Sequence, residues 1–390
     1  MNESRADHIK TTTLANFAIP VFLMINTFET GGSERQFVLL TQMLNQSAFE
    51  LHLGCLARQG PLADQFKEIP EFPLGGSLYA WQSVWTRFRL IRHLRACHVE
   101  IAHAFDFYTN LILIPAARFA RVPVVIGSHR QLGDLLSPAK LRAQLFAFRW
   151  CDAVVCNSQA AANRLLTEGV PSEKIVVIGN ALPSVFFDMA APALPRHAEA
   201  LRVGMIARMN ERCKNHAGFL RIAALVHQQM PQVQFVLVGD GPLRCELEQQ
   251  AASLGLGDRI SFLGDRRDIP AILASLDLAV LTSDSESLPN AILEAMGARL
   301  PVVAYDVGGN AELGNDQRGV LVARGNESGF AGAIQHLLSD ESLRTQRGGN
   351  ACRFVQEHYS LDGIREDYEH LYQKLLEKKR GRKLPDAYGT

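Results

Sequence analysis

The chain has 390 residues, 47% of them hydrophobic and 21% charged, which suits two globular domains of about 150–200 residues each. Its 40 basic and 40 acidic residues cancel, so we expect no nucleic-acid partner held through overall charge. Seven scattered cysteines with no C-x-x-C pair argue for reduced thiols and against a disulfide framework or a zinc site. Because the polar N-terminus lacks a signal peptide and no apolar run is long enough to span a bilayer, we predict a cytoplasmic protein.

Short apolar runs rich in Val and Ile alternate with helix-length amphipathic stretches along the first half of the chain. Runs that are continuously apolar are typical of strands buried on both faces of a parallel sheet. The predicted strands are Ala18–Ile25, Leu51–Leu56, Ile101–Ala104, Val122–Ile126, Ala153–Cys156 and Lys174–Ile178. Strand–helix–strand order predicts an α/β fold, with a doubly wound, Rossmann-like domain over residues 15–182.

Three features of this domain lie at or just after the ends of strands, where ligands of parallel sheets bind. Gly31 and Gly32 precede a helix predicted over Glu34–Leu44, and glycines let the backbone approach a ligand closely. His103 ends one strand and His129 follows another. Lone histidines are more often structural than catalytic, but this position makes His129 a candidate catalytic residue.

The stretch from Trp81 to Trp150 is unusually basic for a neutral chain. It holds ten Arg and Lys residues against three Asp and Glu residues, with aromatic residues among them. Such a stretch can be a set of solvated helix faces. It can also be a surface for an anionic acceptor or for peripheral contact with an anionic membrane on its cytoplasmic face.

A linker is predicted over residues 183–200, where several prolines and alanines show no clean period. The alternation then resumes, with predicted strands at Leu201–Ile206, Gln234–Val238, Ile260–Leu263, Leu278–Leu281 and Val302–Ala304. We therefore predict a second Rossmann-like domain over residues 201–358, facing the first across a cleft. An amphipathic helix is predicted over 359–379, followed by a disordered tail over 380–390.

The strongest candidate ligand site is Ser283–Glu294, S-D-S-E-S-L-P-N-A-I-L-E, which follows a strand and opens a helix at Pro289. The first N–H groups of a helix have no partner within it and form an anion site. Glu286 lies just before this site. Glu294 lies beyond the first turn, where it can accept hydrogen bonds from a ribose, and the macrodipole does not explain its position.

Cations that suit a diphosphate follow the first strand of the same domain. Arg208 lies at the strand end and Lys214 six residues later, in A-R-M-N-E-R-C-K. Arginine can bind two phosphate oxygens at once, whereas lysine acts as a point charge. Both would stabilise negative charge on a departing nucleotide diphosphate.

Two other site classes are disfavoured. No G-x-G-x-x-G fingerprint is present; the nearest approach is G-D-G at Gly239–Gly241, which counts against a nicotinamide dehydrogenase. Asp284-Ser285-Glu286 has some likeness to the D-x-D of metal-dependent sugar transferases, but we interpret it as a polar loop. No histidine–carboxylate set has metal-ligand spacing, so we expect neither a metal nor another cofactor.

Together these residues resemble glycosyltransferase family 4, whose members are retaining enzymes of the GT-B fold. The likeness rests on G-G-S-E-R at Gly31–Arg35, A-R-x5-K, V-G-D-G-P-L-R at Val238–Arg244, F-L-G at Phe262–Gly264, the E-x7-E of Glu286–Glu294 and P-V-V-A-Y-D-V-G-G-N-A-E at Pro301–Glu312. Two motifs depart from the family pattern. The usual P-N-G of the linker is I-G-N-A-L-P, and the frequent H-x-H is His103-Ala104-Phe105.

The resemblance implies a role for each candidate residue. Arg208 and Lys214 would bind the diphosphate of a nucleotide-sugar, Glu294 the ribose and Glu286 the transferred sugar. Backbone groups at Gly32 and Leu288 would also contact the donor. On the other side, His129 would lie near the anomeric carbon, and Gly31 and His103 would lie on the acceptor side. The first domain would bind the acceptor, and the last helix would cross back to it.

The leading hypothesis is therefore metal-independent transfer of a hexose or N-acetylhexosamine, with retention, from a UDP-sugar to a glycan or a lipid-linked glycan in polysaccharide biosynthesis. Two alternatives stay open. Epimerases acting on UDP-N-acetylglucosamine share this fold, and a non-catalytic sugar-nucleotide-binding partner would keep the binding residues. The nucleotide, sugar, acceptor and linkage are not determined by these motifs.

Overall fold

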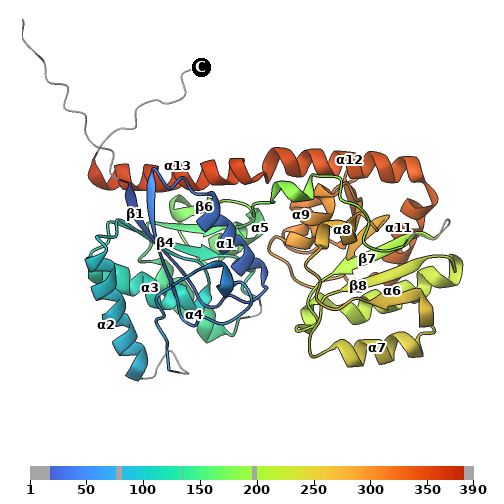
Figure 1. Cartoon of the computed structure of the whole chain (residues 1–390), viewed down its shortest axis with the longest axis horizontal. Helices are drawn as coiled ribbons and strands as arrows, with labels where there is room; N and C mark the ends of the chain where they lie inside the picture. The colour runs from blue at the N-terminus through green and yellow to red at the C-terminus, as the bar shows by residue number, and fades with distance from the viewer. Residues whose placement is uncertain (1–17, 76–80, 135, 196–199, 382–390) are drawn as a thin grey trace, which may run out of the picture.

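The computed structural model describes residues 18–75, 81–134, 136–195 and 200–381. They form two doubly wound α/β domains arranged side by side, each built on a six-stranded parallel sheet (Figure 1). The sheet orders are β2-β1-β3-β4-β5-β6 and β12-β11-β10-β7-β8-β9. Each order reverses around the first strand of its domain, and at such switch points the loops that follow neighbouring strands diverge and open a ligand crevice.

The first sheet is covered on both faces by helices. Its strands are β1 Ile19–Ile25, β2 Phe49–Cys55, β3 Ile101–Ala104, β4 Val124–His129, β5 Ala153–Cys156 and β6 Ile175–Val177. The helices are α1 Gly32–Met43, α2 Trp81–Ala96, α3 Phe107–Ala120, α4 Pro138–Phe148 and α5 Gln159–Thr167. Fully buried side chains fall into one apolar cluster on each face of the sheet, which explains why its strands read as continuous apolar runs.

The second sheet has one large core. Its strands are β7 Arg202–Ile206, β8 Gln234–Val238, β9 Ile260–Phe262, β10 Leu278–Leu281, β11 Val302–Tyr305 and β12 Gly319–Val322. The helices are α6 His216–Gln229, α7 Arg244–Ser253, α8 Ile269–Leu273, α9 Asn290–Gly297, α10 Asn310–Leu313 and α11 Glu327–Ser339. Strand β12 was not predicted; it is a four-residue edge strand with only its two end residues buried, so its apolar signal is short.

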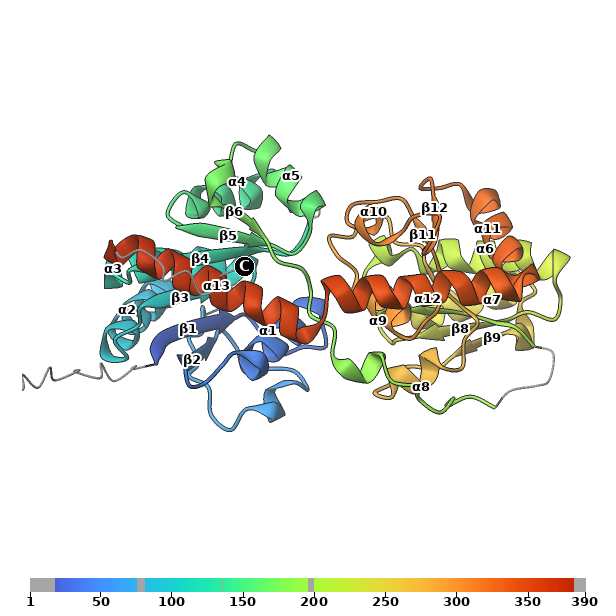
Figure 2. The same ribbon diagram turned by 90° about the horizontal axis from the view of Figure 1, so that it is seen from above.

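The last two helices form a long arm that spans both domains. Helix α12, Glu341–His358, packs on the second domain, and α13, Leu361–Arg380, returns to the first (Figure 2). The chain passes between the domains twice, first after β6 and again between α12 and α13. The two crossing segments are in contact, since the Leu182 amide donates to the Tyr359 carbonyl at 2.8 Å. From α13, Tyr368 and Tyr372 are buried in the core of the first domain.

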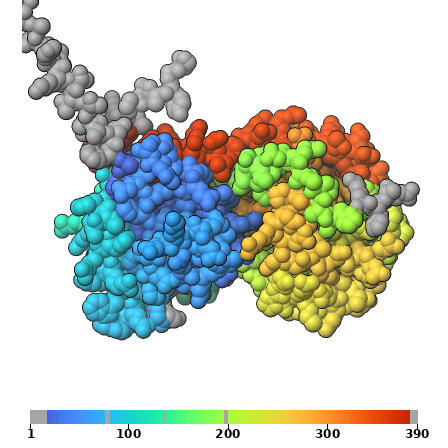
Figure 3. All heavy atoms as spheres, in the orientation of Figure 1, coloured from blue at the N-terminus to red at the C-terminus, as the bar shows by residue number. Residues whose placement is uncertain are grey.

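The space-filling view shows the two domains in close contact, with this arm lying along one side of both (Figure 3). Helix α13 includes Arg380, where the tail was predicted to start, so that boundary was wrong by one residue. The rest of the predicted tail, after Gly381, lies outside the described residues. Within the described ranges, no helix combines the length and apolar character that crossing a membrane requires.

Candidate active site

A cleft of about 350 Å³ lies between the two domains, at the carboxyl ends of both sheets. Its walls come from the loops after β1, β4, β5 and β6 on one side and after β7 and β10 on the other. The predicted site residues on these walls are Gly31, Gly32, Arg208, Lys214, Glu286 and Leu288. Residues far apart in the sequence thus meet because parallel strands end at one edge of each sheet.

Lys214 is held in place by the start of α6 and the end of β10. It ends a short 3-10 turn, and the next residue, Asn215, adopts a left-handed conformation with φ 53° and caps α6 through its side chain. Thr282, just after β10, donates a hydrogen bond to the Asn215 carbonyl at 2.9 Å, and the Asp284 amide donates to the Cys213 carbonyl at 2.7 Å. These bonds fix the lysine beside the Ser283–Glu294 segment.

Lys214 and Glu286 form an ion pair within the cleft. The distance from Lys214 Nζ to Glu286 Oε1 is 2.7 Å, and the side chains are 28% and 10% exposed. Burial alone would lower the pKa of Lys214, but the charge of Glu286 and its hydrogen bond outweigh this effect and raise the pKa. The lysine is therefore cationic at neutral pH, as a diphosphate site requires.

Arg208 is positioned by the G-D-G segment that follows β8. Gly239 and Gly241 have φ 127° and 153°, and a Cβ on either would lie 2.2–2.5 Å from the backbone of Ala207 or Met209. Only glycine allows this approach, so the G-D-G segment, which lacks the third glycine of a dinucleotide fingerprint, packs directly against the loop that carries Arg208. Among the described residues, no hydrogen bond or ion pair holds the Arg208 side chain, which leaves its donors available for an anion.

Glu294 lies next to the cleft and lines a second cavity of about 240 Å³. Its Oε1 pairs with Nη1 of Arg35 at 2.8 Å, whereas its buried Oε2 has no partner. Burial raises the pKa of Glu294, although the charge of Arg35 opposes this effect. Arg35 belongs to α1 of the other domain and lines both cavities. The sequence analysis quoted this arginine only within G-G-S-E-R and gave it no role.

The start of α9 differs from the prediction by one residue. Pro289 is the N-cap, and the helix begins at Asn290. The Asn180 side chain donates to the Leu288 carbonyl at 3.0 Å and to Asn290 Oδ1 at 2.7 Å, which ties this helix start to the first domain. Proline suits either position, because its missing N–H leaves no donor unsatisfied.

A second pair of glycines supports the loop that carries Glu286. A Cβ on Gly308 would lie 1.9 Å from the Glu286 carbonyl oxygen, and one on Gly309 would lie 1.7 Å from that of Ser287. The Gly309 amide also donates to the Glu286 carbonyl at 3.0 Å. The loop after β11 therefore lies directly against the Glu286 backbone, which explains why small residues are needed there.

His129 is fully buried below the Arg130–Asp134 segment of the cleft wall and does not line the cleft itself. Neither ring nitrogen has a hydrogen-bond partner, and the ring packs edge-on against Phe148. Burial, with a smaller contribution from Arg164, lowers the pKa of His129 to about 4. A neutral imidazole with free nitrogens can serve as a donor or acceptor, but it reaches a ligand only if that segment moves.

His103 does not lie on the acceptor side, and the structure corrects that prediction. The residue is fully buried, with Nδ1 at 2.8 Å from the Tyr372 hydroxyl and Nε2 at 2.8 Å from the Ser128 hydroxyl. Both ring nitrogens are thus used within the protein. The position of His103 at a strand end led to the prediction that it is accessible. Instead α13 covers it, and this contact, distant in the chain, leaves no pattern in the sequence of β3.

This burial predicts a pH effect on stability. Burial, with the charge of Arg130, lowers the pKa of His103 to about 3 in the folded protein. The unfolded chain therefore takes up the proton first, and stability falls as the pH drops from about 6.5 towards 3, by at most about 1.4 kcal/mol per pH unit. Urea unfolding between pH 7 and pH 5 should show this slope. His103→Gln should make the slope shallower without abolishing it, because buried His129, with its pKa lowered to about 4, contributes over the same pH range. A slope unchanged by the substitution would contradict the burial of His103 as a cause.

The D-x-D-like segment takes part in loop structure. Its Asp284 amide binds the Cys213 carbonyl, and Glu286 faces Lys214. Across the described residues, no three His, Cys, Asp or Glu side chains gather in a way that could hold a metal ion.

Two parallel doubly wound sheets facing across such a cleft form the GT-B fold, which is the fold of a large class of glycosyltransferases. Family models for "Glycosyltransferase Family 4" and "Glycosyl transferases group 1" match residues 30–184 and 200–340. The chain is 30% identical over 308 residues to EpsF of Bacillus subtilis, a protein named as a glycosyltransferase, covering 73% of this chain and 79% of EpsF. This chain belongs to glycosyltransferase family 4 and is a glycosyltransferase.

Two further comparisons extend this result. An Escherichia coli enzyme, UDP-Gal:alpha-D-GlcNAc-diphosphoundecaprenol alpha-1,3-galactosyltransferase, is 26% identical over 338 residues, which cover 80% of this chain and 86% of that enzyme. The crystal structure of HepE from Anabaena in complex with UDP superposes with a TM-score of 0.80 at 23% identity, covering 91% of this chain and all of HepE. At this level of identity, the similarity to HepE shows a shared fold.

Proposed function

We propose that the protein transfers a hexose or N-acetylhexosamine from a UDP-sugar to a glycan or lipid-linked glycan in polysaccharide biosynthesis. The observation that carries this proposal is the meeting of Arg208, Lys214, Glu286 and the start of α9 in one cleft. The UDP in the HepE structure and the UDP-galactose in the name of the E. coli relative support the choice of nucleotide. The diphosphoundecaprenol in that name supports a lipid-linked acceptor.

In the proposed reaction the bond between the anomeric carbon and the diphosphate oxygen breaks while the acceptor oxygen bonds to the same face of the sugar. The acceptor proton passes to the departing phosphate. Lys214 and Arg208 stabilise the charge that develops on the diphosphate, without a metal ion. The unpartnered Oε2 of Glu294 accepts a hydrogen bond from a ribose hydroxyl. Glu286 contacts the sugar once the bound diphosphate also pairs with Lys214, the present partner of Glu286.

The reaction can be tested with a panel of nucleotide-sugars, a lipid-linked glycan acceptor and separation of the products. A transferase elongates the acceptor and gives only slow hydrolysis without it. Conversion of the sugar in the absence of acceptor would instead indicate an epimerase. Nucleotide binding with no turnover of any donor would indicate a non-catalytic partner, and either result would overturn the proposal.

Peripheral contact with an anionic membrane at its cytoplasmic face is part of this proposal. Among the described residues, eight of the twelve exposed large hydrophobic side chains lie between Trp81 and Trp150. On α2, Trp81, Trp85 and Phe88 share one exposed face and stack edge-on in sequence. Aromatic residues with arginines nearby suit the interface between water and lipid headgroups.

The Trp85→Ala variant should therefore bind anionic vesicles more weakly, by roughly tenfold, because it removes a large apolar surface from the interface. Flotation with vesicles at low salt measures this. Val185→Ala is the control, since Val185 is equally exposed but lies in the linker region. Equal loss in both variants, or no binding by the wild type, would contradict membrane contact through α2.

A further inference from the structure

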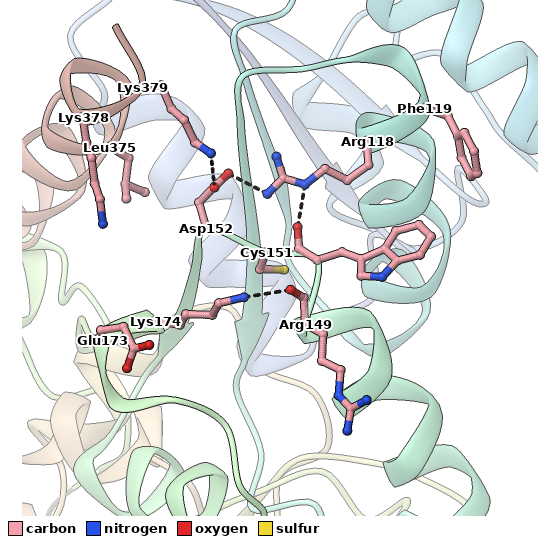
Figure 4. Close-up of a pocket in the computed structure, with 11 residues that line it drawn as sticks. Arg118, Phe119, Arg149, Cys151, Asp152, Glu173, Lys174, Leu375, Lys378 and Lys379 are labelled. Atoms are coloured by element: carbon pink, nitrogen blue, oxygen red, sulfur yellow. Dashed lines mark hydrogen bonds and ion pairs between the residues drawn. The ribbon is translucent and has the colours of Figure 1, made fainter. Parts of the chain in front are cut away.

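Another cavity, of about 840 Å³, lies at the opposite edge of the first domain from the cleft. Its walls come from the segments before β5 and β6 and from the C-terminal ends of α3, α4 and α13 (Figure 4). The cleft lies where strands end, whereas this cavity lies where β5 and β6 begin. None of its residues belongs to the site described above.

The lining is strongly cationic. It holds five basic side chains and two acidic ones: Arg118, Arg149, Lys174, Lys378 and Lys379, with Asp152 and Glu173. Basic residues are favoured at helix C-termini, and each such end adds about half a negative charge. Three helix ends meet here, so their dipoles offset about half of the surplus of three positive charges and leave the cavity positive.

Several of these cations are not neutralised by a partner of their own. Asp152 is shared, with Oδ2 at 2.8 Å from Arg118 Nη2 and Oδ1 at 2.7 Å from Lys379 Nζ. Within the described part of the chain, Lys174 donates only to a backbone carbonyl, that of Arg149, at 2.7 Å. The side chains of Arg149 and Lys378, labelled in Figure 4, form no hydrogen bond or ion pair with any described residue.

The remaining lining is apolar and continues onto an exposed aromatic group. Phe119 and Trp150 line the cavity, and Phe146 lies beside them. The ring centroids of Phe119 and Phe146 are 6.2 and 6.1 Å from that of Trp150. These three side chains are 63%, 37% and 58% exposed. Helix dipoles do not account for exposed aromatic rings, which cost free energy in water unless something covers them.

We propose that this cavity binds the headgroup of a membrane phospholipid that carries two negative charges. The cations hold its phosphate groups, and Phe119, Phe146 and Trp150 lie at the boundary with the acyl chains. A phospholipid carries phosphate next to apolar acyl chains, and this cavity places cations next to exposed aromatic side chains. This inference rests on the membrane contact in the proposed function and gives it a specific site.

The test compares phosphatidylcholine vesicles of equal formal charge that contain either cardiolipin, with two phosphates per headgroup, or phosphatidylglycerol, with one. The wild type should bind cardiolipin vesicles more tightly. The double variant Arg149→Gln/Lys378→Gln should lose this preference and bind them on the order of tenfold more weakly. Both side chains are exposed and have no partner among the described residues, so the fold should be retained.

The matched control is Arg142→Gln/Lys374→Gln, which removes two exposed charges outside the cavity: Arg142 lies on α4, which Arg149 caps, and Lys374 lies on α13 with Lys378. It should keep the preference. No preference in the wild type, or equal loss in both double variants, would overturn the lipid site. Sugar transfer to a water-soluble acceptor without vesicles should be normal in both variants, so a failed transfer assay with intact lipid preference would count against the transferase proposal alone.

Discussion

Lys214→Ala should lower kcat/KM for sugar transfer by about 100- to 1,000-fold, the cost typical of removing one group that stabilises developing charge. Lys214 is a half-buried cation of the cleft, and its Nζ lies 2.7 Å from Glu286 Oε1. Without the lysine, no positive charge at this position stabilises the departing diphosphate, and the unpaired carboxylate of Glu286 repels the diphosphate. The variant should bind UDP much more weakly but uridine as the wild type does, because uridine carries no phosphate.

A control for this variant lies two residues away. Arg212 is in the same 3-10 turn, but it is 76% exposed and pairs with Glu246 on the surface. Because exposed pairs contribute little, Arg212→Ala should change kcat/KM by less than about twofold. Equal activity in the two variants would contradict the assignment of Lys214 to the diphosphate.

Glu294→Ala should raise the Kd for UDP by about 10- to 100-fold, the value of hydrogen bonds to a charged acceptor. The loss should appear for uridine as well, since the ribose is common to both. Isothermal titration calorimetry measures each affinity. This pattern separates the ribose contact from the diphosphate contact, because Lys214→Ala should spare uridine.

Glu294 also joins the domains through Arg35, so its removal needs a control for domain closure. Glu312 joins them elsewhere, where it accepts hydrogen bonds from the Gln159 and Ala160 amides at 2.9 Å, and it does not line the cleft. Glu312→Ala should leave the affinity for UDP within about twofold. If it weakens binding as much as Glu294→Ala does, Glu294 acts through the domain interface and not through the ribose.

The fold could be predicted from the sequence because buried parallel strands leave continuous apolar runs. Eleven of the twelve strands correspond to such runs, and only the short edge strand β12 was missed. Boundaries were less accurate. Strand β4 continues to His129, three residues beyond the predicted end, because G-S-H is less apolar but still pairs with β5.

The meeting of Arg208, Lys214 and Glu286 in one cleft was predictable, because each belongs to a motif that follows a strand end. Contacts that depend on distant packing were not. His103 is buried by α13, whose Tyr372 lies 269 residues later in the chain. Arg35 meets Glu294 only because the two domains are in contact. The cavity before β5 and β6 likewise depends on the C-terminal end of α13, which no local pattern in Trp81–Trp150 reveals.

The central claim, a nucleotide diphosphate bound between the domains, is tested most directly by thermal unfolding with a panel of nucleotides. At a concentration of about 100 Kd, a ligand selective for the folded protein adds about 2.7 kcal/mol, which corresponds to roughly 2 to 5 °C in Tm. UDP should raise the Tm of the wild type and leave that of Lys214→Ala nearly unchanged. A wild-type Tm that no nucleotide raises, or an equal rise in Lys214→Ala, would contradict this account.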